Sequence, residues 1–349
     1  MEGCKAHLAL SKGACSVSIV TGSRKKAVGR LYASLAISLS TCVLWVVPAS
    51  AERVRVAIPA KSLTFLNFYV GENFSAYKSE GLEVSLEQIT PRVGISGMLS
   101  GEIDYMTGIG STLRATATGV PVKALMFTMD RVLLFMLAKP EFKSIKDLKG
   151  RRNIVAVTDI AATPAFAAIA MARAHGVDPA KELTIVSVGT VPIALAALQS
   201  GSADVAILSV PFNFKAEESG FRNLGSAVDY MQSPFAGVGA TETKIQSNPG
   251  QVKRMLRATL KGLQQTKDPA KRETVIGLIV KEFNMDGRTA ARALDESMKA
   301  LSDSGIMPDQ AIKAEMEELQ KRLKIKGELP VSKLVDYTLL KEVLNEMKR

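Results

Sequence analysis

The sequence predicts an α/β fold with two doubly wound lobes and a helical C-terminal region. At 349 residues the chain is longer than a single compact core usually holds. Short apolar segments alternate with helical ones between residues 53 and 240, a pattern typical of parallel strands covered by helices. The pattern Ser-Gly-x-x-Asp occurs at 100–104 and again at 200–204, each time between a predicted helix and an apolar strand. Two lobes built on one local plan would explain this repeat.

Residues 1–51 have the three parts of a secretion signal. A basic cluster at 24–30 precedes an uncharged apolar run at 31–47, and Ala49-Ser50-Ala51 forms a small-x-small cleavage pattern before Glu52. We therefore expect cleavage before Glu52 and a periplasmic mature protein. Three alternatives stay open: lipid attachment at Cys42, an uncleaved anchor helix, and a start site downstream of Met1.

Cleavage would remove every cysteine and leave His175 as the only histidine. Disulfides, thiolate nucleophiles and zinc sites of Cys and His are then excluded from the mature chain, because their ligands are absent. The formal net charge of +11 falls to +6, since residues 1–51 hold six Lys or Arg and one Glu. Basic and acidic residues are interspersed along the C-terminal helices, so we expect no nucleic-acid partner. Since metal ligands of the Cys and His type are absent, we also expect no metal, and we expect no cofactor.

The first lobe is predicted to begin with a strand over 53–59, where polar and apolar residues alternate before a turn. A helix over 65–78 follows, with Ser62 or Thr64 as its N-cap, and Gly81 ends it because glycine accepts the left-handed cap conformation. The alternation continues with a strand at 82–89, a helix at 94–99, a strand at 105–109, a helix at 111–119 and a strand at 122–127.

The second lobe repeats this order of elements. Pro164 suits the first turn of a helix and marks its start. The predicted elements are a strand at 155–158, a helix at 163–175, a strand at 183–188, a helix at 192–199 and a strand at 205–208.

Extended apolar segments at 131–138 and 231–240 are predicted to cross between the lobes. The first lobe is then discontinuous, with residues 52–133 and 236–349, and the second lobe comprises residues 134–235. After residue 249 amphipathic helices are predicted to pack on the first lobe, at 251–266, 271–283, 288–301, 308–323 and 331–347.

Several segments resemble the ABC-transporter substrate-binding proteins with the SsuA/THI5-like, or NMT1-like, domain. They are LSGEID at 99–104, ATGVPVK at 117–123, IKDLKG at 145–150, GVDP at 176–179, ALQSGSAD at 197–204 and AEESGF at 216–221. The resemblance covers residues 52–349. It implies a type II periplasmic-binding fold whose two lobes close on a ligand about the crossing strands.

In doubly wound sheets a ligand lies beyond the carboxyl ends of the strands, next to helix N-termini that favour oxygen-rich groups. The loops there supply our candidate ligand-binding residues: Thr64, Phe65, Arg92, Gly110, Ser111, Thr112, Asp130, Thr158, Ala162, Thr163, Thr190, Ser209 and Phe212.

Each candidate has a purely structural alternative. Ser and Thr at these positions also serve as ordinary helix caps, and Phe65 and Phe212 also fit the core. Arg92, or the pair Asp130 and Arg131, could hold a carboxylate or sulfonate in bidentate fashion. Asp130, next to Arg131, could instead form a salt bridge between the lobes.

The resulting hypothesis is a solute-binding protein of an ABC importer, not an enzyme. It is expected to bind a small organic molecule in the cleft between the lobes, and the candidate classes are anionic, sulfonate-, carboxylate- and pyrimidine-like compounds. Its expected partners are that ligand and an ABC permease with its ATPase, and we expect a monomer. The alternatives are a ligand-sensing protein for another receptor or transporter, and a pyrimidine-synthesising enzyme of the THI5 type. The enzyme would need histidine and iron, and only His175 remains.

Overall fold

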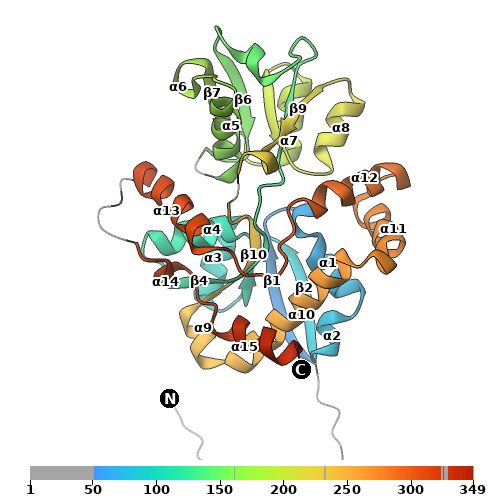
Figure 1. Cartoon of the computed structure of the whole chain (residues 1–349), viewed down its shortest axis with the longest axis vertical. Coiled ribbons are helices and arrows are strands. Elements are labelled where there is room, and N and C mark those ends of the chain that lie inside the picture. The colour runs from blue at the N-terminus through green and yellow to red at the C-terminus, as the bar shows by residue number, and fades with distance from the viewer. Residues whose placement is uncertain (1–50, 161, 232, 324, 326–328, 349) are drawn as a thin grey trace, which may run out of the picture. The chain divides into compact units, whose positions relative to one another are not determined.

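In the computed structural model, the first of two sheets takes its strands from separate stretches of the chain. Its strands are β1 (Glu52–Ile58), β2 (Leu82–Gln88), β3 (Tyr105–Met106), β4 (Val122–Met129) and β10 (Ala236–Thr241). Their order is β2-β1-β3-β10-β4. β1 pairs in parallel with β2 and β3, and β10 pairs antiparallel with β3 and β4. The chain therefore returns to this sheet after completing the other (Figure 1).

The second sheet has the same plan. Its strands are β5 (Phe135–Ala138), β6 (Asn153–Val157), β7 (Leu183–Ser187), β8 (Val205–Leu208) and β9 (Arg222–Ser226), in the order β7-β6-β8-β5-β9. β6 pairs in parallel with β7 and β8, and β5 pairs antiparallel with β8 and β9. β9 was not predicted, because Arg222 and Asn223 are exposed and the strand lacks an apolar face.

The structure describes residues 51–160, 162–231, 233–323, 325 and 329–348, and Ala49–Arg349 form one compact unit. The predicted secretion signal lies outside the described residues except for Ala51. Within the described ranges, no helix is long and apolar enough to cross a membrane.

Two segments connect the sheets, one between β4 and β5 and one between β9 and β10. Each ends in a strand that enters its new sheet antiparallel to its neighbours. The prediction of two crossing strands is confirmed, and the sheets are mixed because of these strands.

Helices lie between the strands of both sheets. Those of the first sheet are α1 (Leu66–Asn73), α2 (Ala76–Ser79), α3 (Pro91–Ser100), α4 (Ile109–Ala117) and α9 (Glu242–Ser247). Those of the second are α5 (Thr163–Ala174), α6 (Pro179–Glu182), α7 (Val191–Gln199) and α8 (Phe212–Glu218). The single helix predicted over 65–78 is divided into a 3₁₀ turn at Leu63–Phe65, α1 and α2. The break before α2 falls at Ser75, whose φ of 60° is left-handed.

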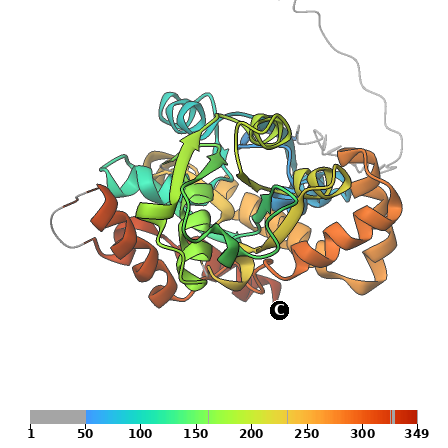
Figure 2. The same ribbon diagram turned by 90° about the horizontal axis from the view of Figure 1, so that it is seen from above.

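The C-terminal region is helical, as predicted, and packs on the first sheet. Its helices are α10 (Pro249–Lys267), α11 (Arg272–Phe283), α12 (Gly287–Met298), α13 (Asp309–Leu323), α14 (Val331–Leu334) and α15 (Thr338–Met347). Backbone hydrogen bonds tie it to β4, from Phe127 N to Gly305 O at 2.8 Å and from Asp336 N to Ala124 O at 2.9 Å. In Figures 1 and 2, α11 and α12 lie on one side of the molecule and α13 on the other.

The repeated Ser-Gly-x-x-Asp element performs the same structural task in each half. Asp104 Oδ2 accepts from the amide of Arg55 at 2.9 Å, and its Oδ1 pairs with Lys244 Nζ at 2.6 Å. Asp204 Oδ2 accepts from the amide of Ile154 at 2.9 Å, and its Oδ1 pairs with Lys139 Nζ at 2.7 Å. Each aspartate thus joins the first parallel strand of its sheet to a lysine that follows the crossing strand.

Candidate functional site

Loops at the carboxyl ends of strands from both sheets meet. The amide of Leu63, in the turn after β1, donates to the carbonyl oxygen of Val210, in the loop after β8, at 3.3 Å. Both residues are buried. This edge of each parallel strand pair is where α/β sheets place their ligands.

Gly110 and Thr163 are brought together in the same region, where the loops of the two sheets meet. Gly110 lies in the first turn of α4, after β3, and Thr163 begins α5, after β6. A β-carbon at Gly110 would lie 3.1 Å from Thr163 Oγ1 and 3.4 Å from the carbonyl oxygen of Pro234, on the second crossing segment. Both residues are buried. Two residues predicted independently from the two halves therefore share one location.

Arg114 lies one helical turn after Gly110, and its guanidinium group lies beside Gly110. Its Nη2 donates to Ser111 Oγ at 2.8 Å, while its Nη1 is buried and has no hydrogen-bond partner among the residues that the structure describes. That Nη1 lies 3.4 Å from the position of a β-carbon at Gly110. Burial lowers the pKa of Arg114, opposed by the carboxylates of Glu315 and Asp159. Sequence reasoning missed Arg114, although a lone charge four residues after Gly110 in an apolar helix was an available signal.

The other first-sheet candidates have structural partners. Thr64 is buried and its Oγ1 accepts from Ser62 Oγ at 3.1 Å; Ser62 caps the turn by accepting from the Thr64 amide at 3.2 Å. Phe65 belongs to the main apolar cluster. Thr112 Oγ1 donates to the carbonyl of Gly108 at 3.3 Å.

The second-sheet candidates lie in the loops after β6, β7 and β8 or at the starts of the helices that follow them. Ala162 and Thr190 are the N-cap residues of α5 and α7, and Thr190 is exposed. Ser209 is buried, and its carbonyl accepts from the amide of Phe212 at 2.8 Å. Phe212 is part-buried against the main apolar cluster, with Lys215 Nζ 5.4 Å from its ring centroid. Thr158 is half-buried, and its carbonyl accepts from the amide of Gly189 at 3.0 Å.

Among the described residues, the two charged candidates, Arg92 and Asp130, make no hydrogen bond or ion pair with Gly110 or Thr163. Arg92 is exposed in the first turn of α3, which begins three residues earlier than predicted, so it does not lie in a loop. Asp130 is part-buried, and burial raises its pKa while Arg131 opposes that shift. Among the described residues neither side chain makes a salt bridge.

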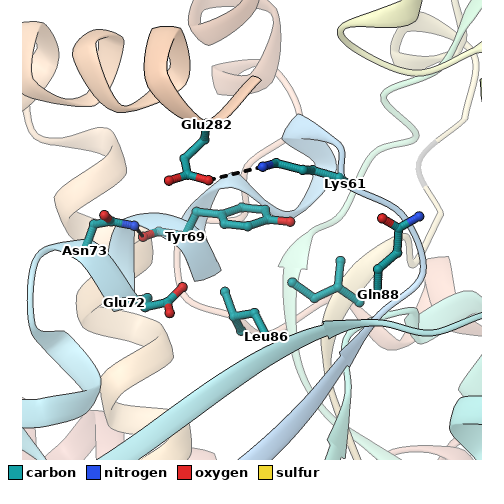
Figure 3. A pocket seen from close by; sticks show the side chains of 8 residues that line it. Lys61, Tyr69, Glu72, Asn73, Leu86, Gln88 and Glu282 are labelled. Carbon is teal, nitrogen blue, oxygen red and sulfur yellow. Dashed lines mark hydrogen bonds and ion pairs between the residues drawn. The ribbon is translucent and has the colours of Figure 1, made fainter. Parts of the chain in front are cut away.

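A cavity of about 440 Å³ lies beside the same edge of the first sheet, between α1, α11 and the ends of β1 and β2 (Figure 3). Lys61 and Glu282 form an ion pair there at 3.3 Å. None of the predicted ligand-binding residues lines the cavity. Its walls are Ile58, Lys61, Tyr69, Glu72, Asn73, Leu86, Gln88 and Glu282.

The cavity carries excess negative charge. Burial and the nearby Glu282 carboxylate raise the pKa of Glu72. Burial, with the carboxylates of Glu282 and Glu72, raises the pKa of Tyr69 to about 12. Lys61 neutralises only one of the two carboxylates, so the cavity disfavours anions.

The part of the chain that the structure describes contains no group of three or more His, Cys, Asp or Glu side chains that could hold a metal ion.

A family model described as NMT1/THI5 like matches residues 62–271. Among characterised proteins, the riboflavin-binding protein RibY of Chloroflexus aurantiacus is 26% identical over 214 residues, which is 59% of each chain. The aligned part therefore spans less than two thirds of that relative.

Solved structures share the fold at low sequence identity. The periplasmic aliphatic sulphonate binding protein SsuA of Escherichia coli superposes with a TM-score of 0.65 and 15% identity, covering 82% of this chain and 92% of its own. The periplasmic nitrate-binding protein NrtA of Synechocystis gives 0.69 and 13%, covering 86% and 89%. These likenesses confirm the periplasmic-binding fold class.

Proposed function

Because the chain belongs to the NMT1/THI5-like family and has the periplasmic-binding fold, we propose that it is the solute-binding protein of an ABC importer. Its ligand is a small organic molecule held between the loops of the two sheets. The observation that carries this proposal is the contact of Gly110 with Thr163, because it joins the carboxyl-end loops of both sheets at one point.

The two sheets are proposed to form two lobes, residues 52–133 with 236–349 and residues 134–235, that open and close about the crossing segments. A ligand that contacts both lobes stabilises the closed form by its differential affinity for that form. The closed surface is then what an ABC permease, with its ATPase, would recognise. In this account the protein is exported by its N-terminal signal and acts as a monomer in the periplasm.

The ligand is proposed to be a small organic compound, and the relatives suggest which compounds to test. They bind a flavin, a sulphonate and nitrate according to their names, so they do not agree on one chemistry. Alternatively, the ligand-bound protein is recognised by a membrane receptor or by another type of transporter. Genes for an ABC permease and its ATPase next to the gene for this protein would favour the importer.

A thermal-shift screen tests the proposal directly, because any compound that binds the native state alone raises the unfolding temperature. The panel comprises riboflavin, pyrimidines, aliphatic sulphonates, aromatic carboxylates and nitrate. We expect at least one class to raise the unfolding temperature in a concentration-dependent manner.

Two variants locate the site of any compound that scores. Thr163→Val keeps the shape and removes the hydroxyl at the gap, whereas Ser96→Ala makes a comparable change at an exposed position of α3. The shift should fall in Thr163→Val and persist in Ser96→Ala. A panel without any stabilising compound, or equal shifts in both variants, would count against this function or this location.

A further inference from the structure

Arg292 joins a helix of the C-terminal region to a helix of the second sheet. It lies on α12, and its Nη2 pairs with Glu217 Oε2, on α8, at 3.4 Å. Its guanidinium carbon lies 4.9 Å from the centroid of the Phe214 ring, which is also on α8. Phe214 and Glu217 are three residues apart and therefore share one face of that helix. A single side chain of α12 thus contacts two residues of the same face of α8.

Each helix of this contact is fixed to a different sheet. The segment after α12 bonds to β4, because the amide of Ser302 donates to the carbonyl oxygen of Thr128 at 3.0 Å. On the other side, Glu217 Oε1 accepts from Asn223 Nδ2, on β9, at 2.8 Å. That bond orients the carboxylate and leaves its Oε2 to Arg292. The chain of contacts therefore runs from the first sheet to the second.

The contact combines a partly exposed ion pair with a covered aromatic ring. The side chain of Arg292 is 60% exposed and that of Glu217 is 25% exposed, so the ion pair alone adds little and is weakened by salt. Phe214 is only 5% exposed and belongs to the main apolar cluster. A guanidinium group over an aromatic ring adds a second attraction. If α8 moved away from α12, both attractions would be lost together.

This contact lies away from the one between Gly110 and Thr163. In Figure 1, α8 and α12 lie on one side of the molecule, and α4 and α5 lie on the other. The two sheets are thus joined at two separate places. We propose that Arg292 is a latch between the lobes, whose contacts with Glu217 and Phe214 hold the ligand-free protein in its closed form. This inference rests on the two-lobe motion of the proposed function. A latch of this kind raises the apparent affinity for a ligand that binds the closed form.

The opening of the lobes can be measured on the protein without any ligand. All three cysteines lie within residues 1–51, so the chain from Glu52 onward accepts spin labels only at introduced cysteines. Lys146→Cys, in the 3₁₀ turn before β6, and Lys281→Cys, on α11, place one label on each lobe at exposed positions. Double electron–electron resonance gives the distances between the labels and the share of molecules at each distance. The distance that matches this structure identifies the closed form.

Variants of the latch should change the ratio of closed to open molecules. Arg292→Gln removes the charge and the contact with the ring, so we expect the ratio to fall by about threefold to tenfold. Glu217→Gln removes only the ion pair and should give a smaller fall. Arg288→Gln, the matched change at an exposed arginine one helical turn earlier on α12, should leave the ratio unchanged. Raising the NaCl concentration from about 0.1 M to about 1 M should lower the ratio more in the unmodified protein than in Arg292→Gln.

An unchanged ratio in folded Arg292→Gln would overturn the latch, as would an equal fall in Arg288→Gln or one identical distance in every protein. Circular dichroism establishes that each labelled variant is folded. These outcomes leave the proposed function intact if a compound of the thermal-shift panel stabilises the protein in a manner that depends on Thr163. Failure of the whole panel would instead remove the proposed function, whereas the distance measurement needs no ligand.

Discussion

Gly110 and Thr163 are so close that a β-carbon on the first would lie 3.1 Å from the hydroxyl oxygen of the second. One belongs to the helix after β3 and the other to the helix after β6, so the contact joins the two sheets. A side chain at position 110 would hold the two helix starts apart.

Gly110→Ala should therefore reduce ligand binding with little loss of stability. Alanine favours the helix by up to about 1 kcal/mol, which offsets part of the crowding. We expect the ligand-induced rise in unfolding temperature to fall by at least half. Gly277→Ala, in α11 with no atom near its β-carbon position, is the matched control and should keep the full shift. An undiminished shift in Gly110→Ala would show that the gap does not hold the ligand.

Asp204→Asn should destabilise the protein. It removes the carboxylate that bonds to the Ile154 amide and pairs with Lys139, whose side chain is only 26% exposed. We expect a loss of about 1–3 kcal/mol in the free energy of unfolding, measured with urea. Asp303→Asn is the control: its side chain is 96% exposed, and it should cost no more than about 1 kcal/mol. Equal losses in the two variants would contradict the structural role of the repeat.

The contribution of Asp204 should disappear in acid. Burial opposes ionisation, but the Lys139 ammonium and the Ile154 amide outweigh it and lower the pKa of Asp204. A lowered folded pKa means that the stabilisation is complete above the unfolded value of about 3.9 and is lost as the pH falls through the folded value. The stability difference between the unmodified protein and Asp204→Asn should be constant from pH 7 to pH 5 and shrink below about pH 4. If the stability difference between the two proteins grew in acid, this would contradict a lowered pKa of Asp204.

Glu72→Gln should slightly raise the unfolding temperature at pH 7. The folded pKa of Glu72 is raised, so the native state loses stability as the pH rises from about 4.3 through the folded value. Glutamine removes that loss, although solvent screening keeps the gain small. Glu83→Gln, an exposed partner of Arg53, should give no gain. The advantage of Glu72→Gln should vanish near pH 4, and its persistence there would point to packing instead of charge.

Export predicts a defined mature terminus. N-terminal sequencing of the protein recovered from the periplasm should begin at Glu52, the first residue of β1. Recovery of an intact N-terminus from the cytoplasm alone would contradict the proposed location. A lipid on Cys42 would instead yield a terminus ten residues earlier.

The order of most elements could be predicted from the sequence, because alternation of short strands and capped helices depends on local patterns. It did not predict β9, whose residues Arg222 and Asn223 are exposed and which is specified by pairing with β5. Nor did it predict that Ser75 would break the first helix, because a left-handed conformation is uncommon for serine and no local pattern indicates it.

The positions of Gly110 and Thr163 at helix starts after strands were predictable for the same reason. Gly110 and Thr163 follow strands of the two sheets, and the strand order brings those positions together. The place of Arg114 beside Gly110 was not predicted, since it depends on which face of α4 points to the second sheet. Arg92 was placed in a loop because the start of α3 at Pro91 was missed, although proline is common in the first turn of a helix.

Hydrogen exchange with and without a stabilising compound tests the central claim most directly. If the ligand lies between the two sheets, it should protect amides at the start of α4 and at the start of α5 together, beyond the general protection that stabilisation gives to the cores. Protection confined to the loops of one sheet, or to the cavity beside Tyr69, would contradict the account.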